Sequence, residues 1–221
     1  MSRSGKENAQ LNMLESYLKK LCLYDSRNTF PNTGFNIAAV RGLEYADIWK
    51  THITHQWYDF RLDDNSLLYF HKEGSEVNYS YLGCPFDCIS YKEYKTRVEL
   101  DGYEDEDIAE LYEDYLCTTN LKTTPNYFRY DYEEESYRPG EHPVAHMHCG
   151  IMESVRIGLT KQLDIMSFAA FVLRQVYVDK WSLVLNHKGD YHELYIHKAN
   201  LSNIESKFYQ QQDIEQDFYL N

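Results

Sequence analysis

A chain of 221 residues with 43% hydrophobic side chains can bury a substantial core, which excludes a generally disordered protein. Its formal net charge of −13 opposes binding to nucleic acid or to an anionic membrane through clustered Lys and Arg. The 21 tyrosines suit half-exposed sheets and partner surfaces, because the ring packs while the hydroxyl stays hydrated. A protein partner or a small polar ligand is therefore expected.

The sequence predicts a cytoplasmic protein without a membrane segment. Its first ten residues, MSRSGKENAQ, are polar and no apolar signal segment follows them. The most apolar stretch, residues 165–178, is too short to span a bilayer and contains Arg174. The five cysteines form an odd, unpatterned set that fits reduced thiols. Cys84 and Cys88 have the spacing of a metal-binding pair, but no second pair follows, so buried or bystander thiols are favoured.

In the first half of the chain, hydrophobic periodicity predicts helices and short strands. Leu11, Leu14, Leu18, Leu21 and Cys22 have helical spacing, which indicates an amphipathic helix over 7–24. A short strand is expected at 34–42, residues 45–62 are ambiguous between helix and strand, and 66–83 is expected to form a hairpin turning near Gly74. Residues 91–119 predict two helices around Gly102, the second of them acidic. Its DGYEDED stretch is interpreted as a helix start rather than a calcium loop or a nucleic-acid mimic.

The second half predicts strands at 126–134, 144–150, 153–159 and 191–197. Residues 163–181 are apolar nearly all round and predict one buried central helix with Asp164 as its N-cap. A polar C-terminal segment follows at 198–221. Because no repeat or linker divides the chain, we expect one α+β domain over 1–221, with a mostly antiparallel sheet, a buried central helix and peripheral helices.

The stretch GEHPVAHMHCG, residues 140–150, contains three histidines. In an extended strand the small apolar side chains of 145, 147 and 149 point to one face and those of His146 and His148 to the other. The same alternation in the neighbouring strands turns Arg129, Asp131 and Arg156 outward, while Val155 and Ile157 turn inward. If these strands are neighbours, one sheet face carries the whole polar set, with His142 near the strand entrance: Arg129, Asp131, His142, His146, His148 and Arg156.

Three interpretations of this polar face remain open. Its side chains can bond to backbone, to Asp131 and to water without any further role. Alternatively, histidine acting as general acid and base beside arginine can cleave an RNA phosphodiester without a metal. Finally, two histidines at i and i+2 can share a metal with Asp131 or His142 as third ligand. The two arginines favour an anion over a cation, so neither a metal nor a cofactor is expected.

Several segments in this order resemble a prokaryotic family of unknown function, domain of unknown function 2290: WYDFRLDDNSLLYF, YSYLGCP, FRYDYEEESY, HPVAHMHCG, VRIGL and FVLRQVY. The resemblance covers roughly residues 45–181 and implies a bacterial cytoplasmic protein. A shorter likeness joins FRYDY and HPVAHMH to ribonuclease toxins of bacterial toxin–antitoxin pairs. That likeness implies a site made of Arg129, Asp131, His142, His146 and His148, with histidine as acid and base and arginine binding phosphate.

Two functions follow as hypotheses. The first is a non-catalytic interaction subunit of a bacterial multi-gene system, such as an antiphage-defence system, that binds a protein encoded nearby. The charge, the tyrosine excess and the lack of a strong catalytic motif motivate it. The second is a metal-independent ribonuclease or other phosphoester-directed, toxin-like enzyme that uses the His/Arg face, with RNA as partner. Whether the protein is an enzyme stays open at this point.

Overall fold

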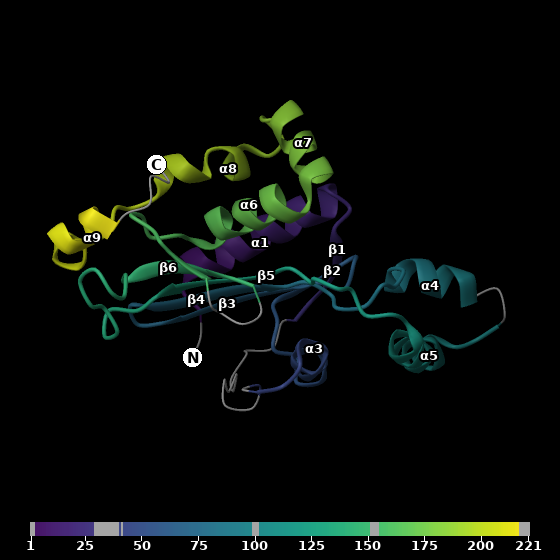
Figure 1. Ribbon diagram of the computed structural model, residues 1–221. Coiled ribbons are helices and arrows are strands. Elements are labelled where there is room, and N and C mark those ends of the chain that lie inside the picture. The colour runs from purple at the N-terminus through teal and green to yellow at the C-terminus, as the bar shows by residue number, and fades with distance from the viewer. Residues whose placement is uncertain (1–2, 29–39, 41, 99–101, 151–154, 217–221) are drawn as a thin grey trace. The chain divides into compact units, whose positions relative to one another are not determined.

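The computed structural model describes residues 3–28, 40, 42–98, 102–150 and 155–216 (Figure 1). Within these ranges the chain forms helices and one sheet whose seven strands follow one another in chain order, β1 to β7. The pairs β1–β2, β2–β3, β5–β6 and β6–β7 are antiparallel. The predicted α+β class with an antiparallel sheet is confirmed. Most of the strand expected at 34–42 lies outside the described residues.

The strands are β1 (Tyr24–Arg27), β2 (Phe60–Leu62), β3 (Leu67–Glu73), β4 (Glu76–Leu82), β5 (Tyr127–Tyr132), β6 (Ala145–Cys149) and β7 (Val155–Gly158). The α-helices are α1 (Gly5–Lys20), α3 (Tyr45–Thr54), α4 (Tyr91–Val98), α5 (Asp105–Thr118), α6 (Ile165–Val176), α7 (Val178–Asn186), α8 (His192–Tyr195) and α9 (Gln211–Gln216). Short 3-10 helices follow at His197–Asn200 and Ser206–Phe208.

The residues group into two compact units, whose boundaries fall inside α1, β3 and β4 and directly before β5. The first unit comprises Leu18–Tyr69 and Leu82–Asn126. In it, Trp49 of α3 is 1% exposed, and its ring centre lies 5.5 Å from that of Phe86. The Tyr45 hydroxyl donates a 2.8 Å hydrogen bond to the carbonyl of Gly83. The ambiguous segment 45–62 thus begins as helix α3 and ends as strand β2, as its more β-like second half indicated.

The second unit comprises Ser2–Tyr17, Phe70–Tyr81 and Tyr127–Asn221. Helices α1 and α6 lie over one face of the β4–β5–β6 part of the sheet (Figure 1). Phe168 of α6 packs there, with ring centres 6.1 Å from Phe70 and 5.9 Å from Tyr79. Tyr79 of β4 and Tyr130 of β5 face these helices. Because successive side chains of a strand point to opposite faces, the residues next to these tyrosines in β4 and β5 point to the other face of the sheet.

Asp164 caps α6, as predicted. Its carboxylate accepts a 2.8 Å hydrogen bond from the Ser167 amide, and the Ser167 hydroxyl accepts one of 2.8 Å from the Asp164 amide. The single helix expected over 163–181 is wrong, because α6 ends at Val176 and α7 begins at Val178. Tyr177 between them has the non-helical angles φ −109° and ψ 59°, and its hydroxyl lies 3.1 Å from that of Tyr81. This contact holds the residue at the corner between the two helices.

Two other expectations are also corrected. The final strand predicted at 191–197 is helix α8, because Tyr191 and Leu194 are the buried residues and their spacing of three fits a helical turn. Cys22, placed on the buried stripe of the first helix, is exposed and has φ 53°, since α1 has already ended at Lys20. The hairpin at Gly74, which has φ 61°, and the two helices on either side of Gly102 are confirmed.

Candidate functional site

The register between β5 and β6 brings four of the predicted site residues onto one sheet face. Arg129 lies opposite His148 and Asp131 lies opposite His146. Hydrogen-bonded and non-hydrogen-bonded residue pairs alternate along an antiparallel ladder. Because the Glu133 amide donates to the Val144 carbonyl, the two pairs named above are both hydrogen-bonded pairs. Directly paired side chains of an antiparallel sheet are neighbours on the same face. The strand alternation read from the sequence therefore gave the grouping of these four side chains.

The Asp131 carboxylate is the centre of this cluster. Its Oδ2 accepts a 2.9 Å hydrogen bond from Arg129 Nε, and lies 3.3 Å from His148 Nε2 and 3.7 Å from His146 Nε2. Its Oδ1 accepts a 2.6 Å hydrogen bond from the Asn78 side-chain amide on β4. The carboxylate is thus held by donors at both oxygens, and both imidazoles lie beside the same oxygen. Asn78 was not among the predicted residues, although the alternation of β4 places it opposite the buried Tyr79.

The two imidazoles are enclosed. His146 is 2% exposed and His148 is 3% exposed, so the face they occupy is covered rather than wet. Burial lowers the pKa of His146 to about 4 against the opposing effect of Asp131, so this ring is neutral at neutral pH. Burial also raises the pKa of the Asp131 carboxyl, but the His148 hydrogen bond and the Arg129 charge together bring it below its usual range.

The hydrogen bond at its other nitrogen fixes the tautomer of His146. Nδ1 lies 2.9 Å from the carbonyl oxygen of Pro143. A carbonyl oxygen accepts, so Nδ1 of the neutral ring must carry the proton and Nε2 must present a lone pair. Asp131 Oδ2, which is also an acceptor, lies 3.7 Å from this nitrogen and therefore beyond hydrogen-bond distance.

The structure places His142 and Arg156 at the margin of the cluster. The ring centre of His142 is 4.8 Å from that of His146, and its Nδ1 is buried without a hydrogen-bond partner among the described residues. Burial and the Arg156 charge lower the pKa of His142. Arg156 lies opposite His148 in the β6–β7 register, but its side chain is exposed. Val155, expected to be buried, is 50% exposed, because β7 is the last strand in the sheet order.

Chemically, this arrangement offers ligand atoms. Among the described residues, one group of His, Cys, Asp or Glu side chains has the spacing of a metal site, namely Asp131, His146 and His148, with one ligand atom of each within 4.8 Å of the others. For general acid–base catalysis the imidazoles would have to reach a substrate. Side chains exposed by 2–3% do not offer that access to a polynucleotide in this conformation.

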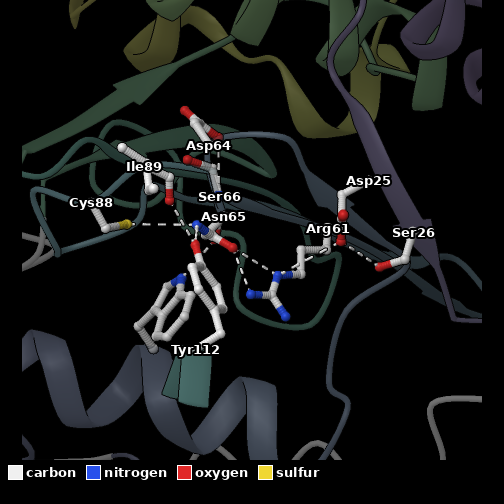
Figure 2. A network of polar contacts seen from close by, with 10 residues as sticks. Asp25, Ser26, Arg61, Asp64, Asn65, Ser66, Cys88, Ile89 and Tyr112 are labelled. Atoms are coloured by element: carbon white, nitrogen blue, oxygen red, sulfur yellow. Dashed lines mark hydrogen bonds and ion pairs between the residues drawn. The ribbon is translucent and has the colours of Figure 1, made fainter. Parts of the chain in front are cut away.

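A second polar network lies in the first unit and was not expected from the sequence (Figure 2). Its centre is Asn65, which sits in the β2–β3 turn with φ 64° and is 1% exposed. Its Oδ1 accepts hydrogen bonds of 2.6 and 3.0 Å from Arg61, and its Nδ2 donates one of 2.5 Å to the Tyr112 hydroxyl. The sequence signal was a DDNS turn between two strands, which indicates a turn but not the burial of its asparagine.

The same network reaches two cysteines. Asn65 Nδ2 lies 3.6 Å from Cys88 Sγ, and that sulfur lies 3.9 Å from Cys84 Sγ. The hydrogen bond with Cys84, helped by those from Tyr112 and Asn65, lowers the pKa of the Cys88 thiol to about 7 against the effect of burial. The Cys84 pKa is raised, first by the hydrogen bond with Cys88 and then by burial. Among the described residues no third metal ligand accompanies this pair.

A pocket of about 500 Å³ adjoins β7 in the second unit. Its lining combines apolar side chains of β7 and of the C-terminal segment with a few polar ones, including Val155, Ile157, Ile204, Phe208, Arg156 and Asp213. A Cβ on Gly158 would lie 3.1 Å from Pro143 Cγ, so the chain packs closely at this point. The pocket is thus lined by the exposed strand β7 and by apolar side chains of the C-terminal segment.

Within the described residues no helix has the length and apolarity needed to cross a membrane. The features above define the chain as an α+β protein with a buried His–His–Asp cluster on its sheet. The particular family is identified by comparison, since the family model for "Uncharacterized conserved protein (DUF2290)" matches residues 21–217. The chain belongs to this family. Neither a curated protein nor a solved structure matches it.

Proposed function

We propose that the protein acts in the bacterial cytoplasm as an interaction subunit of a multi-gene system, and that it binds an extended segment of a partner protein along β7. The observation that carries this proposal is the outer edge of β7 beside the 500 Å³ pocket. Extended segments bind such edges by adding a strand, with side chains entering adjacent pockets.

The register shows which backbone groups of β7 are available to such a segment. The Leu159 amide donates to the Ala145 carbonyl across the β6–β7 pair. By antiparallel alternation, the backbone groups of Val155 and Ile157 also face β6, while those of Arg156 and Gly158 face away. No described strand pairs with that outer side. The residues directly after β7 already pair with another backbone segment, since the Ile204 amide donates a 3.2 Å hydrogen bond to the Thr160 carbonyl.

The surface chemistry supports a protein partner. Val155 on this edge is 50% exposed, and α7 presents Val178, Leu183 and Leu185 at 59%, 42% and 43% exposure. Exposed apolar side chains of this kind favour protein contacts. The net charge of −13 favours a partner segment that carries basic residues.

The phosphoester-cleaving function predicted as the alternative receives less support. It needs imidazoles that meet the substrate, whereas His146 and His148 are nearly fully enclosed and Arg129 already donates to Asp131. An RNA-cleavage assay on the purified protein, with His146→Ala/His148→Ala as the inactive reference, tests it directly.

The experiment is co-expression of the full chain with the products of the genes beside its own, followed by titration calorimetry of any complex. Arg156→Pro removes the outward amide of β7, and edge strands tolerate proline. Arg156→Ala removes the same side chain and keeps the amide. We expect a complex of fixed stoichiometry. Arg156→Pro should weaken it at least about tenfold, because the variant loses one backbone hydrogen bond and its ring clashes with the partner segment. Arg156→Ala should weaken it much less. A chain that stays monomeric with every neighbouring product, or equal affinities for both variants, would overturn the proposal.

A further inference from the structure

We propose that Asp131, His146 and His148 form a binding site for a divalent first-row transition-metal ion, with Zn²⁺ as the ion to be tested. This inference does not depend on the interaction function proposed above. It assigns a role to the buried polar cluster, which an interaction surface at β7 does not use.

The two distances from the Asp131 carboxylate to the imidazoles are close to those of a zinc site. Zinc binds imidazole nitrogen and carboxylate oxygen at about 2.0–2.2 Å in tetrahedral geometry, which places neighbouring ligand atoms about 3.3–3.6 Å apart. Asp131 Oδ2 lies 3.3 Å from His148 Nε2 and 3.7 Å from His146 Nε2. Displacements of a few tenths of an ångström bring these two distances to the values of a zinc site, and the three ligand atoms all lie within 4.8 Å of one another before an ion binds. Two imidazoles beside one carboxylate favour a transition metal over Mg²⁺ or Ca²⁺, which prefer oxygen ligands.

The groups behind the ligands are those that orient metal ligands in proteins. A metal-bound histidine usually donates its second N–H to a carbonyl or carboxylate, and a ligating carboxylate is itself hydrogen-bonded. His146 meets this condition, because Nδ1 donates to the Pro143 carbonyl and Nε2 is the nitrogen that lies beside Asp131. Asp131 meets it through Asn78 at Oδ1 and Arg129 at Oδ2.

A purely hydrogen-bonded cluster explains part of this arrangement. The Nε2–H of His148 can donate to Asp131, and Arg129 completes an ion pair. It leaves His146 Nε2 without a hydrogen bond to the carboxylate, because this nitrogen lies 3.7 Å from Asp131 Oδ2 inside an enclosed site. It also does not explain the neighbouring His142, whose buried Nδ1 has no partner among the described residues. Two ring nitrogens beside one carboxylate oxygen form a ligand set that a transition-metal ion can bind.

The test is metal binding by the full chain, purified without a histidine tag and stripped with a chelator. Equilibrium dialysis against Zn²⁺, with the metal measured by mass spectrometry, gives the stoichiometry, and competition with a chromophoric chelator gives the affinity. We expect one Zn²⁺ per chain, and affinity reduced by about 100-fold or more in His148→Ala and in Asp131→Asn, beyond the 10- to 100-fold typical of lost outer-shell partners. The control variant, His187→Ala/His192→Ala, removes two exposed histidines and is expected to bind like the wild type.

Circular dichroism of the metal-free variants shows whether they fold. Because a ligand variant that does not fold is uninformative, the wild type is also titrated with Co²⁺, whose visible spectrum reports nitrogen ligation and coordination number without any substitution. A spectrum of hydrated Co²⁺ throughout the titration, or stoichiometric Zn²⁺ binding that survives in folded His148→Ala, would overturn the proposal. Loss of binding in the control variant would do so as well, because it would place the ion at the exposed histidines.

Discussion

The Asn65 network gives the sharpest test of how the first unit is held together (Figure 2). Replacing Asn65 by alanine removes the acceptor for Arg61 and the donor to Tyr112 in one step. It also places an alanine at φ 64°, a left-handed conformation that asparagine tolerates better than alanine does. The residue is 1% exposed, so water does not readily replace the lost partners.

The expected loss follows from these contributions. Losing the charged hydrogen bonds from Arg61 costs about 1.5–3 kcal/mol, and losing the donor to Tyr112 about 1 kcal/mol. The left-handed backbone adds about 1 kcal/mol for alanine. Because contributions within one network are not additive, we expect a decrease of about 3–5 kcal/mol in the free energy of unfolding.

Two further substitutions separate these contributions. Asn65→Gly loses the same hydrogen bonds without the steric penalty of the positive φ, so it should be less destabilised than Asn65→Ala by up to about 1 kcal/mol. Asn65→Asp keeps an acceptor for Arg61 and loses the donor to Tyr112, so it should cost less than either. Urea denaturation followed by tryptophan fluorescence measures all three, and Trp49 is a local reporter because its indole N–H donates to the Asn65 carbonyl. A loss below about 1 kcal/mol in Asn65→Ala would refute the assigned role of this network.

Two more predictions concern the same unit. A Cβ at Gly83 would lie 2.7 Å from the Asn126 carbonyl oxygen. Gly83→Ala should therefore lower the free energy of unfolding by about 1–3 kcal/mol, and Tm by about 2–4 °C for each kcal/mol. The control Gly189→Ala, whose Cβ would have nothing within 4 Å, should leave Tm unchanged in the same calorimetric scan. The lowered pKa of Cys88 predicts that its alkylation by iodoacetamide is half-maximal near pH 7, because the thiolate is the reactive form. Cys84→Ala removes the hydrogen bond to Cys88 and should move that midpoint upward. Peptide mass spectrometry reads both midpoints, and an unchanged midpoint contradicts the assignment.

The grouping of the polar face was predictable because strand alternation depends on the backbone alone. In β6, Ala145 and Met147 are buried on one side, and His146 and His148 must then lie on the other. The register with β5 is not set by this alternation, because a shift of two residues would keep every side chain on the same face. Alternation says nothing about what covers a face, and therefore the burial of the two imidazoles was not foreseen.

Helix boundaries near the C-terminus were less predictable. In YHELYIH the apolar residues fit both a strand and one helical turn, and the choice depends on which side chains find a core. Tyr191 is 7% exposed and Leu194 is fully buried, which selects the helix. At Tyr177 the sequence contains no Gly or Pro that would mark a corner, and the corner is set by a contact with Tyr81, nearly a hundred residues earlier in the chain. Contacts so distant in sequence leave no local signal.

The two arginines that argued against a metal in the sequence play different parts in the structure. Arg129 donates to Asp131, so its charge is compensated by the carboxylate and its side chain orients a ligand. Arg156 is exposed on β7, and its charge acts on His142 at the margin of the cluster rather than on the Asp131 carboxylate. The charges of Asp131 and Arg129 compensate each other before an ion binds. A divalent ion thus brings an uncompensated double charge, so the affinity should be lower than in cysteine-rich zinc sites. An anion, by contrast, would have to compete with Asp131 for Arg129 at 2.9 Å while facing the lone pair of His146, which makes a cation the better-matched occupant.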